Sequence, residues 1–465
     1  MNWSWFALRG VIALAVLVTL FLSQRFWFRA IWRTTGRWRM SWLRITARAL
    51  YCGALVVVIA AIAGGLRMGN HGHLRQKEAL LVIFAGLWFS SALFAFFAVE
   101  IVHGVEHLWN WYRKGKNKAP AVVEAAAGTV AGTSASSETS APYHSIGERL
   151  AISERLADPS RRYFFRTASV LAGAAPFAGA VYGFAAERLN YHVRRIEIPI
   201  ANLPPAIDGM KIAQISDIHM SAFMSRAAVR RAVDMTNELG SDLTVVTGDL
   251  ITGAHDPIAE CVEEVSRLHA PLGVWGCNGN HEIYADAEEL AEQLFAQHGM
   301  KMLRQENAVL EYRGAKFNLI GVDYQRERNL NGHRTQMLSN LEPLIHRDMP
   351  NILLSHNPNS FDRAAELGVE LSLAGHTHGG QIQVEILDHR LTPARFISDY
   401  IAGLFERPML MSSRKVLVQA EPDMPAGTPN PNASRLYVNR GLGTVGAPVR
   451  LGVPPEISLI VLRRA

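Results

Sequence analysis

Short polar motifs follow several apolar runs in the second half of the chain. Asp217–His219 follows KIAQIS, Gly248-Asp249 follows LTVVT, and Gly279–Glu282 (GNHE) follows GVWGC. His356 follows NILLS, and Gly375–His378 (GHTH) follows LSLA. Carboxylate, imidazole and amide side chains are the groups from which proteins build divalent metal centres. The spacing therefore indicates a set of metal ligands that comes from five separate loops.

This composition is what a dinuclear hydrolytic centre requires. Two ions about 3.5–4 Å apart need a bridging carboxylate and several imidazole or oxygen ligands. Imidazole suits Zn, Fe or Mn, and carboxylates lower the net charge of the ion pair. Such ions polarise a phosphoryl oxygen and acidify a bound water, and a nearby histidine can protonate the leaving oxygen. A lone DxH arises often by chance, whereas five pieces in this order indicate a phosphoryl-transfer site.

The elements that must position these residues are short strands alternating with helices. Amphipathic periodicity predicts helices over Arg226–Leu239 and Asp286–Gln297, the second with a capping box formed by Asp286 and Glu289. Strand–helix alternation predicts a layered α/β domain, and α/β domains place their sites at strand ends. The expected strands are 211–216, 243–247, 272–277, 317–322, 352–355, 371–374, 436–439 and 457–462.

These motifs resemble the calcineurin-like metallophosphoesterase family, whose pattern is DxH, GDxx[DG], GNH[DE], H and GHxH. The resemblance covers about residues 195–465. It looks closest to the bacterial membrane-associated branch, because SDIHMS, LAGHTHGGQI and RGLGT stand at 216–221, 373–382 and 440–444. It implies an αββα sandwich, in which two packed sheets are flanked by helices.

The resemblance also implies a role for each site residue. One divalent ion is expected on Asp217, His219 and His378. The second is expected on Asn280, His356 and His376, with Asp249 bridging the two. His281 is expected to contact the phosphate and act as the acid. The chain departs from the family pattern at Thr252, where many members have Asp, and at Glu282, where Asp is commoner.

The first 190 residues have a different character. The chain is 49 % hydrophobic with a mean hydropathy of +0.06, which indicates segments in lipid. Four apolar stretches, 3–23, 49–66, 79–99 and 167–186, approach the ~20 residues that a membrane-spanning helix needs. The loop 25–48 carries seven arginines and no acidic residue, so the positive-inside rule places it in the cytoplasm. Everything after residue 187 is then expected on the extracytoplasmic, periplasmic side of a multi-pass protein of the cell membrane.

We divide the chain accordingly into four parts. These are a membrane domain with three spans (1–115), a low-complexity cytoplasmic linker (116–160), a segment with the fourth span (161–190) and the phosphoesterase domain (191–465). Ser160–Arg166 (SRRYFFR) resembles a twin-arginine export signal. The alternatives are a positively charged stop beside a helix, and a buried globular helix in place of the fourth span.

The resulting hypothesis is a membrane-anchored, two-metal hydrolase of phosphate mono- or diesters, with a substrate that is either free or lipid-linked. One alternative is a membrane sensor, channel or scaffold with a vestigial phosphoesterase domain, although no ligand position is lost. Another is a metal-dependent nuclease. Nucleic acid is not expected as a partner, because the domain shows no basic stripe with interleaved aromatic residues. The stretch 405–434 is expected to be a surface insertion or lid whose Phe405, Met409, Leu410 and Met411 either contact acyl chains or pack on the domain.

Overall fold

The computed structural model describes residues 3–68, 76–116, 159–200, 203–326, 335–386, 389–396, 398–408, 418–419 and 433–465. The expected linker at 116–160 and most of the 405–434 insertion, including Met409–Met411, lie outside these ranges. Two compact units are present, each described here by itself. The first combines Met1–Ala54 with Trp88–Ala178, and the second combines Leu55–Leu87 with Gly179–Ala465.

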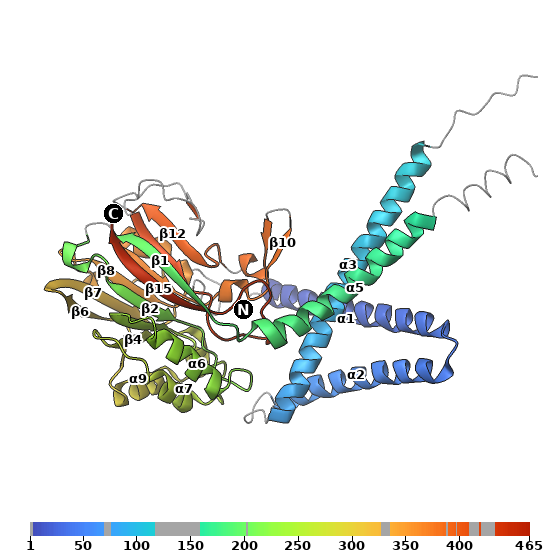
Figure 1. The fold of residues 1–465 in the computed structure, drawn as a ribbon, viewed down its shortest axis with the longest axis horizontal. Helices are drawn as coiled ribbons and strands as arrows, with labels where there is room; N and C mark the ends of the chain where they lie inside the picture. The colour runs from blue at the N-terminus through green and yellow to red at the C-terminus, as the bar shows by residue number, and fades with distance from the viewer. Residues whose placement is uncertain are drawn as a thin grey trace, which may run out of the picture. The chain divides into compact units, whose positions relative to one another are not determined.

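Long apolar helices form the N-terminal part of the chain (Figure 1). They are α1 (Trp3–Gly36), α2 (Ser41–Met68), α3 (Gln76–Lys116) and α5 (Pro159–Tyr182). Among the described residues, three stretches are long and apolar enough to cross a membrane: Ser41–Ala60, Phe84–Tyr112 and Tyr163–Glu187. They coincide with the second, third and fourth expected spans. The first expected span lies in α1, where most side chains before residue 18 are outside the description.

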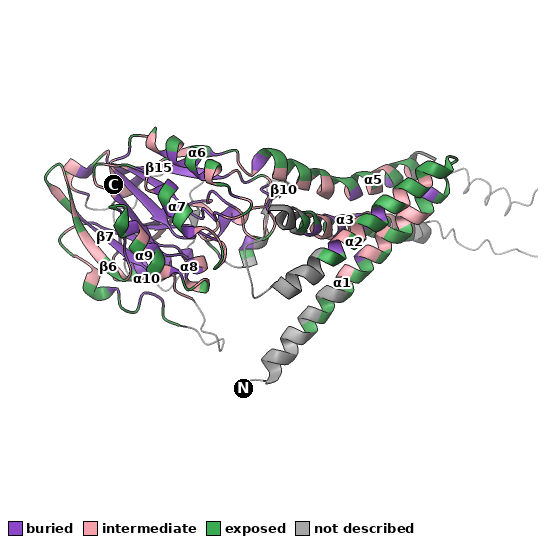
Figure 2. Cartoon of the chain, turned by 90° about the horizontal axis from the view of Figure 1, so that it is seen from below, coloured by how far each residue is buried: buried purple, intermediate pink, exposed green. Residues whose placement is uncertain are grey.

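The helices expose apolar side chains, as Figure 2 shows by the extent of exposed surface along them. Phe21 is 65 % exposed, Leu171 63 % and Ile101 67 %. Soluble proteins rarely leave large contiguous apolar surfaces in water. These faces are therefore suited to the hydrocarbon region of a bilayer.

The second unit contains two packed sheets. The six-stranded sheet has the order β1 (His192–Ile200), β15 (Glu456–Arg464), β2 (Lys211–Ile215), β3 (Leu243–Thr247), β4 (Val274–Cys277) and β5 (Lys301–Met302). Strands β2 to β5 are parallel, with Ile215 opposite Val246 and Thr247 opposite Cys277. Strand β15 runs antiparallel to β2 and parallel to β1.

The seven-stranded sheet has the order β13 (Val418–Gln419), β12 (Gly403–Pro408), β14 (Ala433–Val438), β9 (Leu371–Ala374), β8 (Asn351–Ser355), β7 (Ala315–Val322) and β6 (Glu306–Tyr312). Strands β7, β8, β9 and β14 are parallel. A separate hairpin joins β10 (Val384–Ile386) to β11 (His389–Leu391). Each expected strand is present to within two or three residues at its ends.

Helices cover the outer faces of both sheets. The six-stranded sheet carries α6 (Arg226–Asn237), α7 (Ile258–Val265) and α9 (Glu288–Gln297), and the seven-stranded sheet carries α10 (Phe361–Leu367) (Figure 1). Strand alternation separates the cores. Val245 points into the core between the sheets, and Val246 points into the core beneath the helices. The unit is thus the expected αββα sandwich.

One local prediction was wrong, and one pair of alternatives is decided. Asp286 does not cap α9, which begins at Glu288. It has a left-handed φ of 54°, because it follows the short helix α8 (Asn280–Tyr284), where the chain must reverse. Of the two alternatives for Phe405, packing on the domain holds: the residue is 3 % exposed and meets Tyr400 edge-to-face with ring centroids 5.1 Å apart.

The last turn of α5 continues into a π-helical segment, Gly183–Glu187, that packs directly on the sandwich domain. A Cβ atom at Gly183 would lie 2.4 Å from the Arg450 carbonyl oxygen, so only glycine permits this contact. The Glu187 carboxylate accepts a hydrogen bond from the Gly452 amide at 3.2 Å. The Arg188 guanidinium donates to the Phe223 carbonyl at 2.6 Å. The segment Gly183–Glu187 therefore packs as part of the sandwich domain's own unit.

Candidate metal centre

Five loops that follow β2, β3, β4, β8 and β9 meet at one edge of the two sheets. Because these strands are parallel within each sheet, their carboxyl ends lie on the same side. Seven of the eight sequence-predicted residues form three interlocking groups, in each of which the candidate ligand atoms lie within 4.8 Å of one another. The groups are Asp217, His219 and His378; His219, Asp249 and His281; and Asp249, His356 and His376.

Asp249 lies at the centre of the cluster. Its Oδ2 atom is 3.0 Å from Nε2 of His356 and 3.5 Å from Nε2 of His219. Its Oδ1 atom accepts the backbone N–H of His281 at 3.0 Å. Asp217 lies beside it, with Oδ1 3.3 Å from Nε2 of His378. Asp249 therefore contacts members of both predicted ligand sets.

Backbone carbonyls fix the orientation of three histidine rings. A carbonyl can only accept, so Nδ1–H of His219 donates to Ile251 at 3.1 Å, and Nδ1–H of His356 donates to Thr247 at 2.6 Å. The same contact joins Nδ1 of His281 to the Thr252 carbonyl at 2.6 Å. Each ring then presents Nε2 toward the cluster. Metal-binding histidines are commonly held by a hydrogen bond of this kind on the other ring nitrogen.

The donor set fits a pair of divalent ions. Nε2 of His219 lies 3.1 Å from Nε2 of His378, so both nitrogens and the Asp217 carboxylate converge on one point. In the part of the chain that the structure describes, Oδ1 of buried Asn280 and Nδ1 of buried His378 have no hydrogen-bond partner. Asn280 is adjacent to His281 on the loop that contacts Asp249. A buried amide oxygen without a donor is costly in a protein alone, and a cation satisfies it.

The electrostatics favour positive charge. Burial acts against a charge on His356, but the carboxylates of Asp249 and Asp217 outweigh it and raise its pKa to about 10. Farther from Asp249, burial dominates and lowers the pKa of His219 to about 3 and that of His376 to about 4. The centre therefore draws positive charge to His356, beside the two carboxylates, and keeps the imidazoles of His219 and His376 neutral and available as ligands for divalent transition ions.

The loops carry backbone strain at the ligand positions. Five of the predicted ligands have positive φ angles, a conformation that non-glycine residues rarely adopt: Asp217 (48°), His219 (49°), Asp249 (56°), His376 (75°) and His378 (53°). Two glycines give the carboxylates space. A Cβ atom at Gly279 would lie 2.1 Å from Oδ1 of Asp249, and one at Gly375 would lie 2.2 Å from Oδ2 of Asp217. Such strain at a functional site persists only where the surroundings hold it.

Glu282 is one of the residues that stabilise these strained loops, a role that the sequence analysis did not predict. This carboxylate is fully buried. Its Oε2 atom accepts the amides of Asp249 and Gly279 at 2.9 and 2.8 Å, and Oε1 accepts the Leu250 amide at 2.8 Å. Glu282 therefore joins the GD loop to the GNH loop without pointing at the centre. Burial raises its pKa to about 7.

Arg450 has a comparable role and was not predicted. Its buried guanidinium donates to the carbonyls of Arg440, Gly441 and Gly443 at 2.9, 3.0 and 2.6 Å. These hydrogen bonds hold the RGLG loop against Asp217. The contact is close, because a Cβ atom at Gly441 would lie 2.6 Å from the Cβ atom of Asp217. Five guanidinium N–H groups suit a carbonyl-rich loop of this kind. The RGLG motif was visible in the sequence. Nothing in the sequence indicated that Arg450, ten residues after Arg440, binds the carbonyls of this motif.

An aromatic rim borders the cluster. The Tyr324 ring lies 5.3 Å from the His376 ring, and the Tyr284 ring lies 5.9 Å from the His281 ring, measured between centroids. The Arg326 guanidinium lies 4.8 Å from the centroid of Tyr284. Tyr324 follows Asp323 at the end of β7, so its position at a strand end was the signal. Asp323 itself accepts from Asn278 and Arg304 at 2.8 and 3.0 Å, which is a structural role.

Comparison with known proteins agrees with this geometry. Residues 210–380 match the family model described as calcineurin-like phosphoesterase, so this segment, which carries all the candidate site residues, is similar to that family. A bovine transmembrane protein with a metallophosphoesterase domain is 30 % identical over 59 % of this chain and 57 % of its own length. An uncharacterized metallophosphoesterase of Bacillus subtilis is 28 % identical over 65 % of this chain and 98 % of its own.

A further relative, a UDP-2,3-diacylglucosamine pyrophosphatase of Chlamydia trachomatis, is 26 % identical over 56 % of this chain and 86 % of its own length. The chain thus spans less than two thirds of the bovine protein and most of the two bacterial ones. Among solved structures, the NAD nucleotidase of Haemophilus influenzae aligns with a TM-score of 0.31 and 14 % identity, covering 50 % of this chain and 45 % of that one.

Replacing Glu282 tests its role in holding the loops. In Glu282→Gln one oxygen becomes an NH₂ group that faces backbone donors, so the free energy of unfolding should fall by roughly 2–5 kcal/mol. Denaturant unfolding of the purified protein measures this. Glu289→Gln removes the same charge from an exposed position on α9 and should change stability by less than about 0.5 kcal/mol. Equal stability of the two variants would contradict the assignment.

Proposed function

We propose that the chain is a hydrolase of phosphate mono- or diesters that uses two divalent ions, Zn, Mn or Fe. The observation that carries the proposal is the convergence of two carboxylates and five imidazoles in overlapping groups, beside a loop whose buried Asn280 amide oxygen has no hydrogen-bond partner among the described residues. In this proposal Asp217, His219 and His378 hold one ion, Asn280, His356 and His376 hold the other, and Asp249 bridges them. The ions, when bound, polarise the phosphoryl oxygen and acidify a water.

The chain's own residues position the ester and supply the proton. His281 lies at the edge of the cluster, with its ring 4.7 Å from that of His219. The Thr252 carbonyl fixes Nδ1 of His281, so Nε2 is the atom that can contact the phosphate and protonate the leaving oxygen. The rim formed by Tyr284, Tyr324 and Arg326 borders the same opening and would contact the ester's organic group. A vestigial domain is disfavoured, because no position of the donor set is lost.

The substrate we propose is lipid-linked. Apolar helices of membrane-spanning length precede the domain, and its first strand begins at His192, soon after the last candidate span ends at Glu187. Tethering of this kind raises the effective concentration of a substrate in the same membrane. The similarity to a protein named as a pyrophosphatase of a diacylated sugar nucleotide supports the same class.

We further propose that this is a multi-pass protein of the bacterial membrane-associated branch, with the domain on the periplasmic side. The membrane domain would comprise residues 1–115, the cytoplasmic linker 116–160, the export segment 161–190 and the phosphoesterase domain 191–465. The seven arginines of the loop 25–48 and the SRRYFFR segment support this orientation.

Two substitutions separate metal binding from proton transfer. Asp249→Asn should abolish hydrolysis across a phosphoester panel and lower bound metal, because the bridge carries charge shared by both ions. His281→Ala should lower kcat by about 10²–10⁴-fold and leave metal content nearly intact. Metal analysis and kinetics on the same preparations check this. Equal metal loss in both variants would reject the division of roles.

Vesicle experiments test the lipid-linked substrate. The full chain, reconstituted in liposomes, should cleave a lipid-linked pyrophosphate much faster when enzyme and substrate share a vesicle than when they occupy separate vesicles. A small water-soluble chromogenic ester should be cleaved equally in both arrangements, which makes it the internal control. If sharing a vesicle brings no advantage, the anchor serves location only, while activity on the soluble ester would still support hydrolysis.

Reporter fusions test the orientation. Fusions at about residues 140 and 200 should report opposite compartments, because the fourth span lies between them. Replacing Arg161 and Arg162 by Lys keeps the charge, so it should block export only if the twin-arginine route is used. Cytoplasmic signals from both fusions would show that the proposed orientation is wrong.

A further inference from the structure

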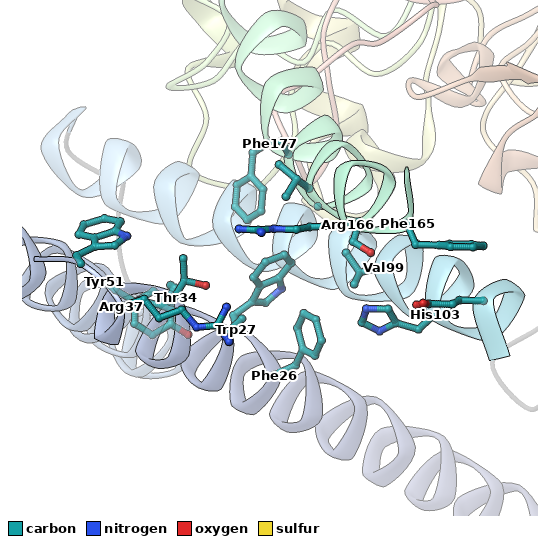
Figure 3. Close-up of a pocket in the computed structure, with 18 of the residues that line it drawn as sticks. Phe26, Trp27, Thr34, Arg37, Tyr51, Val99, His103, Phe165, Arg166 and Phe177 are labelled. Atoms are coloured by element: carbon teal, nitrogen blue, oxygen red, sulfur yellow. The ribbon is translucent and has the colours of Figure 1, made fainter. Parts of the chain in front are cut away.

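The helical unit contains a groove that is separate from the metal centre (Figure 3). Its volume is about 1000 Å³, at the upper end of the range for pockets that bind small molecules. Residues of α1, α3 and α5 line it, together with Tyr51 of α2 and with Arg37 and Trp38 of the α1–α2 turn. All of them belong to the first compact unit. No residue of the candidate metal centre takes part.

The groove follows one face of α5. Phe165, Ser169, Gly173 and Phe177 line it at intervals of four residues, a spacing that keeps side chains on one helical face. A Cβ atom at Gly173 would lie 3.1 Å from the Trp27 ring, so the small residue lets α1 approach closely. The groove is therefore built from packed helices of defined register.

Its floor is aromatic. The Phe177 ring lies 6.2 Å from Trp27 and 5.7 Å from Trp88, and Trp88 lies 5.8 Å from Tyr51, all measured between centroids. The indole Nε1–H of Trp27 donates to the Ala92 carbonyl at 2.8 Å. Its polar atom is thus satisfied within the helices, and its ring carbons are left for an apolar ligand. Hydrocarbon is the occupant that this floor favours.

Two arginines add positive charge to the groove. Figure 3 shows the side chains of Arg37, from the α1–α2 turn, and Arg166, from α5, extending toward its middle. Within the described residues neither guanidinium forms an ion pair. The other ionisable residues in the lining are Glu106 and His103, and His103 lies 3.8 Å from the Glu100 carboxylate. Two guanidinium groups outweigh the single lining carboxylate, and a phosphate is their natural partner.

We propose that this groove binds an anionic phospholipid of the surrounding bilayer, with an acyl chain over the aromatic floor and the phosphate between Arg37 and Arg166. An amphiphile meets both halves of the lining at once, whereas a free phosphate would leave the aromatic floor without an apolar partner. Both arginines lie close to helix ends, where a membrane-spanning helix reaches the headgroup level. The site is independent of the phosphoesterase activity.

Measuring which lipids stay bound to the protein tests the proposal directly. The full chain is reconstituted with equal amounts of phosphatidylglycerol and phosphatidylcholine and extracted into mild detergent, and the lipid that stays bound is quantified by mass spectrometry. Phosphatidylglycerol should be retained preferentially. The double variant Arg37→Gln, Arg166→Gln should lose that preference by about fivefold for each arginine. Ala174→Phe, which narrows the groove without a charge change, should lower the amount of lipid retained.

The matched control is Arg29→Gln, Arg33→Gln, which removes two exposed arginines of α1 that do not line the groove. It should retain lipid as the unaltered chain does. An equal loss of preference in the control would assign lipid retention to general surface charge and overturn the proposal. So would retention that Ala174→Phe leaves unchanged, or displacement of the lipid by inorganic phosphate alone. Circular dichroism confirms that each variant keeps its helices.

Discussion

The attraction between two buried carboxylates and the imidazoles around them is the interaction on which the domain's geometry depends. Asp217 and Asp249 are almost completely buried, at 0 % and 1 % exposure. Charges withdrawn from water in this way are costly unless they are paired. Nε2 of His356 within 3.0 Å of Asp249, and backbone amides at His281 and His376, supply part of that pairing. Bound cations would supply the remaining compensation at the point where the ligand loops converge on these two residues.

That constraint explains the strain and the tight contacts in the surrounding loops. The ligand backbones turn through left-handed conformations so that side chains from both sheets reach one point. Glu282 and Arg450 act on different loops of the cluster. The first gathers backbone amides with a carboxylate, and the second gathers backbone carbonyls with a guanidinium. Each satisfies polar groups that the loops cannot pair among themselves, so the loops hold their shape before any ligand binds.

Much of the fold followed from local sequence patterns, because buried strands such as LTVVT and NILLS are short apolar runs bounded by polar turns. Strands β1 and β6 were not predicted from these sequence patterns. β1 reads HVRRIEIPI and β6 reads ENAVLEY, and their half-exposed faces carry charged residues at sheet edges. The pattern of apolar residues is therefore diluted there. The capping box at Asp286 failed for another reason: the preceding short helix α8 already determines the backbone at that position.

The site residues likewise divide into those that sequence motifs reveal and those that only the fold reveals. Motif residues that follow strands could be found, since the chain direction of parallel strands fixes where they meet. Glu282 was visible as a motif residue, but its function depends on three amides from two loops, which only the fold brings together. Arg450, Tyr284 and Tyr324 were harder to find, because a guanidinium bound to carbonyls and an aromatic rim leave no fixed spacing in sequence.

The packing of Gly183–Glu187 on the sandwich domain has a mechanical consequence. Gly183 lies against the Arg450 carbonyl, and Glu187 receives the Gly452 amide. Arg450 also holds the loop beside Asp217, so one arginine connects the packing at residue 183 to a candidate metal ligand. A side chain larger than glycine at residue 183 would displace the Arg450 backbone, and the disturbance would reach Asp217 without any direct contact between the two residues.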